Sequence, residues 1–225
     1  MINEIELQSG RITLQCFDFT GSAKESIDNG LKFNMEDESP CGFHDADFSD
    51  VAARGYFSFI EAYETENIVD GMTAMELKRR IKTAEFVQTG DFLFAWGNGS
   101  AIKLLASYIS SEYATATKIE FEFNDLFNLQ SRLELCKSVT VKNPKENKVK
   151  TVKLTGTLDC YSEHDVVEPR NHTIKSVSGI MNTPALGKIT VAATDKGVIR
   201  IGTQKGCILP VDVVVWLIKL MSESA

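Results

Sequence analysis

Apolar and polar residues alternate along much of the first half of the chain, which is the pattern of half-buried strands. In residues 4–19 the alternation surrounds a central serine-glycine pair and predicts a hairpin that opens the fold. Residues 34–50 are acidic and lack a regular period, so we expect an irregular segment there. The aromatic run in residues 55–63 predicts a strand, and residues 85–96 predict a second hairpin.

Alternation continues in the second half of the chain. Residues 117–123 predict a strand, and residues 138–143 predict another that pairs with residues 148–161 across a lysine-rich turn. The clearest hairpin lies in residues 187–202, where Asp195-Lys196-Gly197 supplies the turn.

Other segments repeat their apolar residues at helical spacing. We expect helices at residues 23–29, 73–84, 101–109, 125–136 and 210–221. The first begins with a capping box, Ser22 and Glu25, and the second with Thr73 and Glu76. The last is apolar on nearly every side, which favours a buried helix over a partner-binding one.

Strand hairpins separated by single helices indicate an α+β fold, in which antiparallel β-hairpins carry interspersed helices packed on the sheet. The 43% of hydrophobic residues suffice for a core. The chain opens without a signal-peptide pattern, and its longest apolar run is shorter than the roughly 20 residues of a membrane span. We therefore expect a cytoplasmic protein that does not enter a membrane.

Charge divides the chain into two parts. Residues 1–70 hold 15 acidic and 4 basic side chains, whereas residues 71–225 hold 16 acidic and 20 basic ones. This predicts an acidic N-terminal part, 1–70, with a hairpin, a short helix and an acidic loop. It is followed by an α+β core, 71–225, with a lysine-rich hairpin and a C-terminal helix. Such asymmetry is typical of nucleic-acid surfaces and charged arms, although solvated faces produce it too.

Residues 95–105, "AWGNGSAIKLL", have the outline of a phosphate-binding turn: a strand, two glycines and the start of a helix. The Walker pattern is absent, and Ile102 stands where the dinucleotide pattern needs its last glycine. The simpler interpretation is that Asn98-Gly99 turns the chain and Ser100 caps the helix. No other motif indicates a cofactor. The five cysteines are scattered without a C-x-x-C pair, at Cys16, Cys41, Cys136, Cys160 and Cys207.

Two clusters combine histidine with carboxylates. Around His44, the acidic residues Asp45 and Asp47 fall on one side of an extended chain, where they could share a hard cation, although solvated acidic loops are commoner. Around His164, the neighbouring acids would suit a general base, but no nucleophile motif accompanies it and a surface loop is the simpler account. We predict no metal site and no catalytic residue.

Residues 137–153 are the most informative segment, because six lysines there face a single glutamate, Glu146. A lysine-rich hairpin can lie along a phosphate backbone, or it can protect an exposed sheet edge from pairing with another chain. The nucleic-acid hypothesis assigns contacts to Lys142, Lys145, Lys148, Lys150, Lys153, Arg79 and Arg80.

From residue 85 onward the order of elements resembles that of RexA-like phage-exclusion proteins. The similar elements are "DFLFAW", a helix, "TKIEFEF", a helix, "SVTVKN", and "ITVAATDKGVIRIG" with a closing helix. The resemblance is one of layout, covers about 60% of the chain and includes no signature motif. It implies sequence-independent DNA binding in a prophage or defence setting.

The leading hypothesis is therefore a non-enzymatic, nucleic-acid-associated accessory protein. A second hypothesis is an acidic inhibitor or immunity-type protein that binds a basic partner, and a third is a hydrolase with a His/carboxylate site. The second assigns partner contacts to Glu36, Asp37, Asp45, Asp47 and Asp50. The sequence leaves the oligomeric state open.

Overall fold

The computed structural model describes residues 2–37, 40–49, 51–69, 72–142, 151–158 and 173–223. The fold is α+β, as predicted, and it is dominated by antiparallel sheet, with four helices in the described part. The chain forms two compact units, each with strands and helices. Unit 1 consists of Asn3–Phe17 and Lys118–Ala225, and unit 2 consists of Asp18–Thr117.

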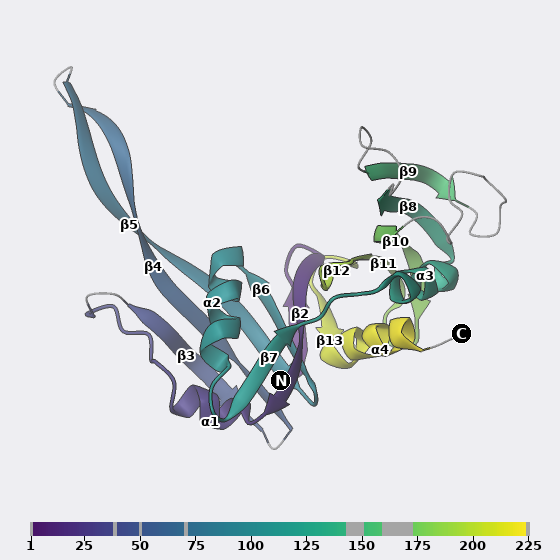
Figure 1. Cartoon of the computed structure of the whole chain (residues 1–225), viewed down its shortest axis with the longest axis horizontal. Helices are drawn as coiled ribbons and strands as arrows, with labels where there is room; N and C mark the ends of the chain where they lie inside the picture. The colour runs from purple at the N-terminus through teal and green to yellow at the C-terminus, as the bar shows by residue number, and fades with distance from the viewer. Residues whose placement is uncertain are drawn as a thin grey trace. The chain divides into compact units, whose positions relative to one another are not determined.

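Unit 2 is built on an antiparallel meander of four strands. These are β3 (Cys41–Phe48), β4 (Ala52–Val69), β5 (Met72–Thr89) and β6 (Phe92–Gly97). β2 (Arg11–Gly21) lies beside β6, and β7 (Ala114–Lys118) pairs with β2. The helices of this unit are α1 (Ala23–Asp28) and α2 (Gly99–Ile109), and α2 covers one face of the meander (Figure 1).

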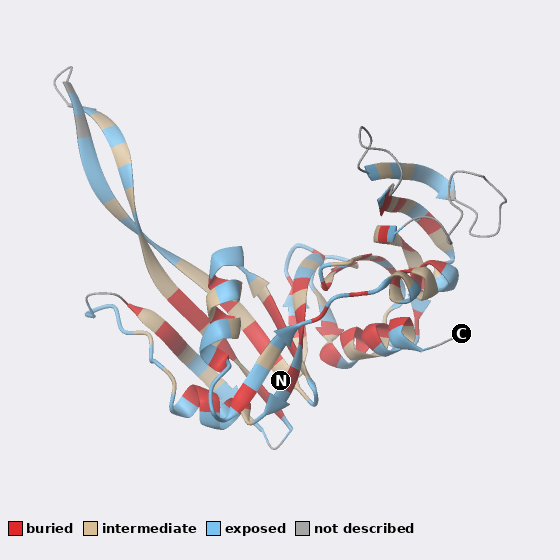
Figure 2. Ribbon diagram, in the orientation of Figure 1, coloured by how far each residue is buried: buried red, intermediate tan, exposed pale blue. Residues whose placement is uncertain are grey.

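The core of unit 2 lies between α2 and that face of the meander. Phe43 meets Phe57 edge-on at 5.3 Å between ring centroids, and it meets Phe86 in the same way at 6.0 Å. All three are buried, because alternate residues of neighbouring strands point to the same face (Figure 2). Leu105 and Ile109 of α2 are buried as well.

Unit 1 contains a second antiparallel arrangement, with strand order β2-β12-β11-β10-β8-β9. Its strands are β8 (Leu135–Lys142), β9 (Thr151–Leu158), β10 (Thr173–Thr183), β11 (Gly187–Thr194) and β12 (Val198–Gly202). Helix α3 (Phe123–Arg132) packs on β10, and α4 (Val211–Ser222) packs on α3. The Asn128 side chain joins the two helices by donating to the carbonyls of Met221 and Glu223, both at 2.8 Å.

The two units share one order of elements: a helix, an antiparallel meander of four strands, and a second helix. Unit 2 has α1, then β3 to β6, then α2, and unit 1 has α3, then β8, β10, β11 and β12, then α4. In unit 1 this order is interrupted by β9, which pairs with β8, and by the short strand β13 (Cys207–Pro210). The first part of β2 pairs with β12.

The predicted opening hairpin is wrong. β1 (Glu4–Leu7) and β2 are both strands, but β1 pairs with β13 and β2 pairs with β12. Gly10 does turn the chain, with a φ of +71°, and its carbonyl then accepts from the Thr203 amide at 2.8 Å. The contact with residue 203 directs the two strands to different partners, which alternation alone cannot indicate.

The predicted helix over 73–84 is also wrong, because these residues belong to strand β5. Its 18 residues pair one by one with the 18 residues of β4, from Ala52↔Thr89 to Val69↔Met72. Leu77 and Ile81 are four residues apart, a spacing that fits both a helix and an alternating strand. The cross-strand pairs with β4 stabilise the strand instead of the helix. The outer part of this hairpin extends beyond the helix-covered part of unit 2 (Figure 1).

Two smaller expectations are changed. Residues 41–48, expected to be irregular, form β3, whose alternation is hidden by a bulge between His44 and Asp47. In 117–123, only the first two residues belong to a strand; Ile119 and Phe121 are nevertheless buried, and their amides donate to Cys16 and Asp195 carbonyls. The predicted pairing of 138–143 with 148–161 is confirmed for residues 138–142 and 151–155, and it stays a prediction for the other residues of the two ranges. The hairpin in 187–202 is confirmed.

Charge is distributed unequally between the compact units. The boundary at residue 70 falls inside unit 2, where β4 and β5 pair with each other across it. Unit 2 holds 17 acidic and 8 basic side chains, a net charge of −9, and unit 1 holds 14 acidic and 16 basic ones, a net charge of +2. In the described part of the chain, no helix is long and apolar enough to cross a membrane.

Candidate nucleic-acid interface

The sheet of unit 1 has one face on the core and one open face, and the strand register identifies the side chains of each. Buried residues such as Ile199 and Ile201 alternate with exposed ones such as Arg200. Residues that are directly opposite on neighbouring strands share a face. The register therefore connects a row on the open face from β2 to β9: Thr13, Arg200, Ala192, Ser178, Ser138 and Thr155.

Five exposed cations on this open face form no ion pair with a described carboxylate. Another exposed cation, Lys188, shares the face opposite Asn182 but is ion-paired with Glu134. Arg11 precedes Thr13 by two residues, and Arg200 pairs with Thr13 directly. Lys153 lies opposite Thr140, two residues from Lys142 on β8. Lys137 occupies the bulge between Cys136 and Ser138 and borders the same surface. We call this set the cationic face: Arg11, Lys137, Lys142, Lys153 and Arg200.

The cationic face lacks acidic side chains among the residues that the structure describes. The positions that share it are mainly hydroxyl, glycine and small apolar residues, including Thr13, Thr140, Ser178 and Thr190. Acids at the ends of these strands are already paired, Glu134 with Lys188 at 3.0 Å and Asp195 with Lys175. In the described ranges, no carboxylate forms an ion pair with any of the five cations.

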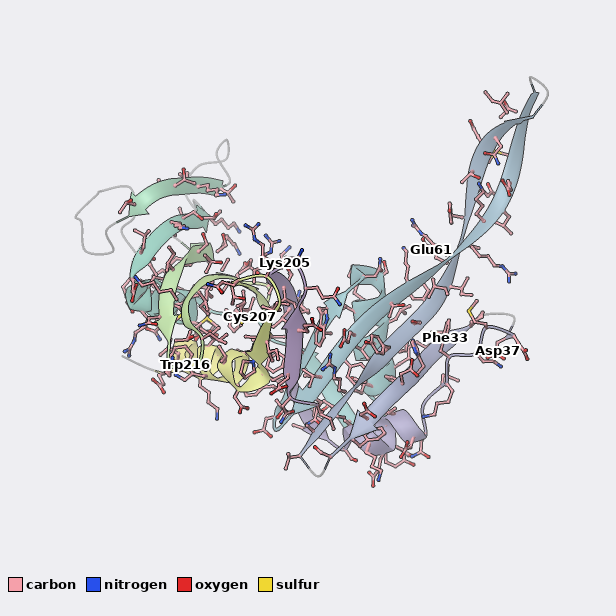
Figure 3. All side chains as sticks on the ribbon, turned by 180° about the vertical axis from the view of Figure 1, so that it is seen from behind. Phe33, Asp37, Glu61, Lys205, Cys207 and Trp216 are labelled. Atoms are coloured by element: carbon pink, nitrogen blue, oxygen red, sulfur yellow. The ribbon has the colours of Figure 1, made fainter. Side chains whose placement is uncertain are left out.

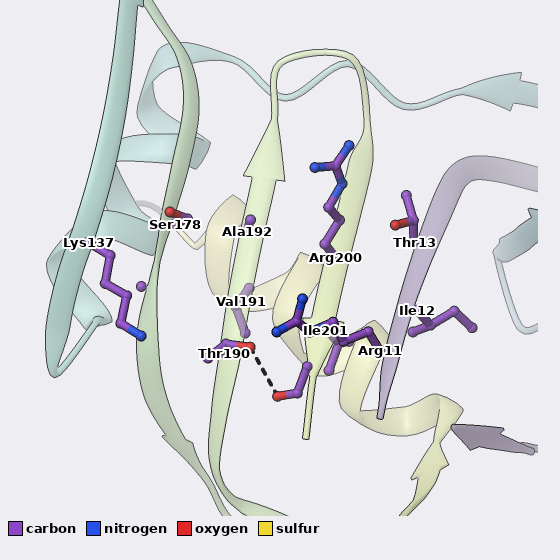
Figure 4. A pocket seen from close by; sticks show the side chains of 12 residues that line it. Arg11, Ile12, Thr13, Lys137, Ser178, Thr190, Val191, Ala192, Arg200 and Ile201 are labelled. Carbon is purple, nitrogen blue, oxygen red and sulfur yellow. Dashed lines mark hydrogen bonds between the residues drawn. The ribbon is translucent and has the colours of Figure 1, made fainter. Parts of the chain in front are cut away.

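Part of this face forms a depression of about 270 Å³. The charged groups of Arg11, Arg200 and Lys137 border it, and Figure 4 shows them spread over β2, β12 and β8. Its floor includes Thr190, whose hydroxyl donates to the Gly202 carbonyl at 3.2 Å. The full lining is Arg11, Ile12, Thr13, Lys137, Ser178, Gly179, Thr190, Val191, Ala192, Arg200, Ile201 and Gly202. Guanidinium and ammonium groups donate hydrogen bonds to oxyanions, so the cations at the border suit an anion with several oxygens, while most of the remaining lining is apolar.

Two of the lysines singled out in the sequence, Lys142 and Lys153, lie on the cationic face. Three others, Lys145, Lys148 and Lys150, lie outside the described residues. The sequence hypothesis missed Arg11 and Arg200. Each arginine is the only basic residue of its strand, so neither forms a cluster in the sequence. Only the pairing of β2 with β12 brings the two arginines together.

Arg79 and Arg80 do not form a common surface. They are adjacent on β5, so their side chains point to opposite faces of the β4–β5 hairpin. Arg80 is ion-paired with Glu61 and lies 5.0 Å from the centroid of the Tyr63 ring. A cation that is held this way is less available to an external phosphate than the cations of unit 1.

The acidic residues proposed as partner contacts lie in unit 2. Glu36 and Asp37 are exposed in the loop before β3, and Asp45 and Asp47 are exposed on β3. Figure 3 labels Asp37 in this loop. The extended geometry expected for Asp45 is not present, because its φ is +48° within the bulge. In the described ranges, no group of three His, Cys, Asp or Glu side chains could hold a metal ion. Asp50 lies outside them.

His44 lies between Asp45 and Ser58 in a chain of hydrogen bonds that joins the same residue types as a hydrolase triad. Its Nδ1 is 2.9 Å from Asp45 Oδ2, and its Nε2 is 2.9 Å from Ser58 Oγ. Ser58 is only 1% exposed and also bonds to Thr83 at 2.7 Å. A nucleophile must reach its substrate, so the buried Ser58 hydroxyl fits a structural role. The His164 cluster, Glu163 to His172, lies outside the described residues.

The glycine turn before α2 is explained by helix capping. Asn98 is the N-cap, and its side-chain oxygen accepts from the amides of Ser100 and Ala101 at 3.0 and 3.3 Å. The predicted cap at Ser100 is therefore wrong by two positions. Because Asn98 already satisfies two of the free amides at this helix start, the turn offers fewer donors to an anion.

Comparison with known proteins adds no assignment. A scan against protein-family models and a search of curated proteins both found no match to this chain.

Proposed function

We propose that unit 1 binds nucleic acid through its cationic face, by contact with the sugar-phosphate backbone and without sequence preference. The observation that carries this proposal is the gathering of five exposed cations, none paired with a described carboxylate, on one face of a sheet in a protein of net charge −7. Each cation that replaces the counterions of a phosphate contributes to affinity, with a strong dependence on salt.

Protection of the sheet edge explains only part of this surface. Lys153 lies on β9, the last strand in the order, where a lysine discourages pairing with another chain. Arg11 and Arg200 lie on β2 and β12, and both strands are paired. Arginines on paired strands do not protect an edge. Phosphate binding therefore explains more residues of the cationic face than edge protection does.

The dimensions of the face suit a polynucleotide better than a single phosphate. From β2 to β9 there are five spacings between strands, and at about 4.8 Å each the face is about 24 Å wide. Consecutive phosphates on one DNA strand advance about 3.4 Å along the helix axis, so this width matches about seven of them. The lysines at 145, 148 and 150 add charge between β8 and β9 in the sequence.

Duplex is the favoured form of the ligand. Proteins that bind single strands without sequence preference stack the bases on aromatic side chains. Among the described residues, neither the row from Thr13 to Thr155 nor the lining of the depression contains an aromatic ring. Hydroxyl and cationic groups can contact backbone phosphates of a duplex and leave the bases stacked.

A salt series tests this function. We expect the full chain to bind duplexes of unrelated sequence with similar affinity, and log Kobs to fall against log salt with a slope of about −4 to −5 for five phosphate contacts. Binding of a single strand of equal length should be weaker. Replacement of all five cations by alanine should abolish duplex binding, whereas Lys103→Ala on α2 should preserve it. Absence of duplex binding at low salt would reject the proposal.

The biological setting rests on the layout resemblance alone. The RexA-like layout implies sequence-independent DNA binding in phage exclusion, and we propose the same setting here. Survival of phage-infected cells with and without the five-alanine variant tests this part separately from DNA binding itself.

A second candidate function is supported by the charge of unit 2. This unit carries a net charge of −9, and Glu36, Asp37, Asp45 and Asp47 are all exposed. Such a surface complements a basic protein, as an inhibitor or immunity protein would. Affinity purification should then recover a basic partner, and Asp45→Asn with Asp47→Asn should weaken its retention.

A further inference from the structure

The outer part of the β4–β5 hairpin, which we call the arm, comprises residues 60–69 and 72–81. The register places two different sets of side chains on its two faces. One face, the apolar stripe, carries Ile60, Ala62, Glu64, Glu66 and Ile68 from β4 and Thr73, Met75, Leu77, Arg79 and Ile81 from β5. The other carries Glu61, Tyr63 and Thr65 opposite Arg80, Lys78 and Glu76, and Asn67 follows Thr65 on this face.

The second of these faces satisfies its own charges. Glu61, which lies where β4 leaves the helix-covered part of unit 2 (Figure 3), accepts from Arg80 Nε and from Lys82 Nζ, both at 2.6 Å. Glu76 is ion-paired with Lys78 at 3.3 Å and accepts a hydrogen bond from Asn67. The charged groups of this face are therefore paired within the β4–β5 hairpin itself and do not require a binding partner.

The apolar stripe, in contrast, exposes large hydrophobic side chains to solvent. Ile68, Met75, Leu77 and Ile81 are 80%, 60%, 64% and 52% exposed, and all four lie on this one face. A two-stranded hairpin is at best marginally stable in water by itself, and contiguous exposed apolar side chains mark interaction sites. In the described part of the chain, no helix packs on the arm (Figure 2).

The charges on the stripe indicate what covers it. Glu64, Glu66 and Arg79 lie among the apolar residues, and none of them forms an ion pair in the described ranges. The stripe thus presents unpaired charges of both signs. A partner of one sign would satisfy the carboxylates or the guanidinium, whereas a second stripe of the same kind supplies both.

We propose that the apolar stripe is the docking surface for a second copy of this chain, with two arms packed face to face. If the arms run antiparallel about the row of Glu64 and Leu77, the row of Arg79 meets the row of Glu66 in the second copy. If they run parallel, Arg79 lies one row from Glu64 of the second copy. Both arrangements are isologous, so each ion pair occurs twice, and the apolar side chains of both stripes leave water together.

Sedimentation of the full chain over a concentration series tests the proposal. We expect the wild type to be a dimer and Leu77→Lys to be a monomer, because burying an ammonium at the centre of the stripe costs more free energy than an ion pair with Glu64, directly opposite, returns. The matched control is Leu31→Lys, since Leu31 is a leucine of unit 2 with similar exposure, 54%. The control should remain a dimer, and circular dichroism should show both variants to be folded.

A charge exchange identifies the surface itself. Arg79→Glu alone should dissociate the dimer by opposing like charges, and so should Glu64→Arg with Glu66→Arg. A mixture of these two variants should form a heterodimer, because every reversed pair then meets its complement. A monomeric wild type would overturn the proposal and leave the stripe to a different protein. A dimer that resists Leu77→Lys, or a mixture without heterodimer, would overturn it as well.

Discussion

Arg200 on β12 and Lys153 on β9 point to the same side of the unit 1 sheet, although β11, β10 and β8 lie between their strands. Their common orientation follows from the register, in which each strand places a residue of the open face directly opposite an open-face residue of the next. The cationic face is therefore a property of strand pairing rather than of any one segment.

The separation of these two residues gives a first prediction. Each of Arg200→Ala and Lys153→Ala should remove one phosphate contact and make the slope of log Kobs against log salt shallower by about 0.9. The double variant should show the sum, because sites without shared contacts act independently. Fluorescence anisotropy with a labelled duplex measures both effects. An unchanged slope in either single variant would exclude that residue from the interface.

A second prediction compares two glycines of the same conformation. Gly187 and Gly197 both have φ +65°, a region that costs an ordinary residue about 1 kcal/mol or more. A Cβ on Gly197 would lie 2.0 Å from the Ile119 carbonyl oxygen, whereas a Cβ on Gly187 would meet nothing within 4 Å. We expect Gly197→Ala to lower the free energy of unfolding by about 1 to 3 kcal/mol more than Gly187→Ala. Urea denaturation compares the two, and equal losses would contradict the close approach of residues 119 and 197.

Helix capping at α2 gives a third prediction. Asn98→Ala removes the acceptor for two backbone amides and should lower the free energy of unfolding by about 1 kcal/mol. Ser100→Ala removes an exposed hydroxyl and should change it by less than about 0.5 kcal/mol. If the ranking of the two variants in urea denaturation were reversed, Ser100 would be the cap after all.

The fourth prediction concerns the acid titration of Glu61. Hydrogen bonds from Lys82 and Arg80 lower the pKa of the Glu61 carboxyl in the folded chain. Its stabilising contribution is therefore present above the unfolded-state pKa and is lost as the pH falls through the lower, folded-state pKa. Lys82→Ala and Arg80→Ala should each raise the pKa of Glu61, because each removes a hydrogen bond and an opposite charge that lower it. Carboxyl NMR titration measures both shifts, and an unmoved pKa in Lys82→Ala would contradict the contact.

Local signals in the sequence were reliable where local physics decides the outcome. Ser22 accepts from the Glu25 amide at the start of α1, as the capping box predicts. The hairpin of residues 187–202 follows from its alternation and from Gly197 at its turn. Both features depend on residues within a few positions of each other.

Signals that fit two structures were not reliable. Thr73, Glu76, Leu77 and Ile81 satisfy a helical pattern, yet the same residues pair with β4 along their whole length. A segment chooses between helix and strand by what it packs against, and that partner, β4, is not visible in the periodicity of β5. Likewise, alternation identified β1 and β2 as strands but could not indicate that their partners are β13 and β12.

By itself, then, the sequence determined the α+β class, most of the strands and helices, and an excess of lysine between residues 137 and 153. These depend on composition, turn chemistry and short-range periodicity. Only the tertiary structure decided that Arg11 and Arg200 join Lys142 and Lys153 on one face, and that the apolar residues of the arm remain exposed. The physical reason is that register and burial arise from pairing between distant segments, and each segment alone is compatible with several partners.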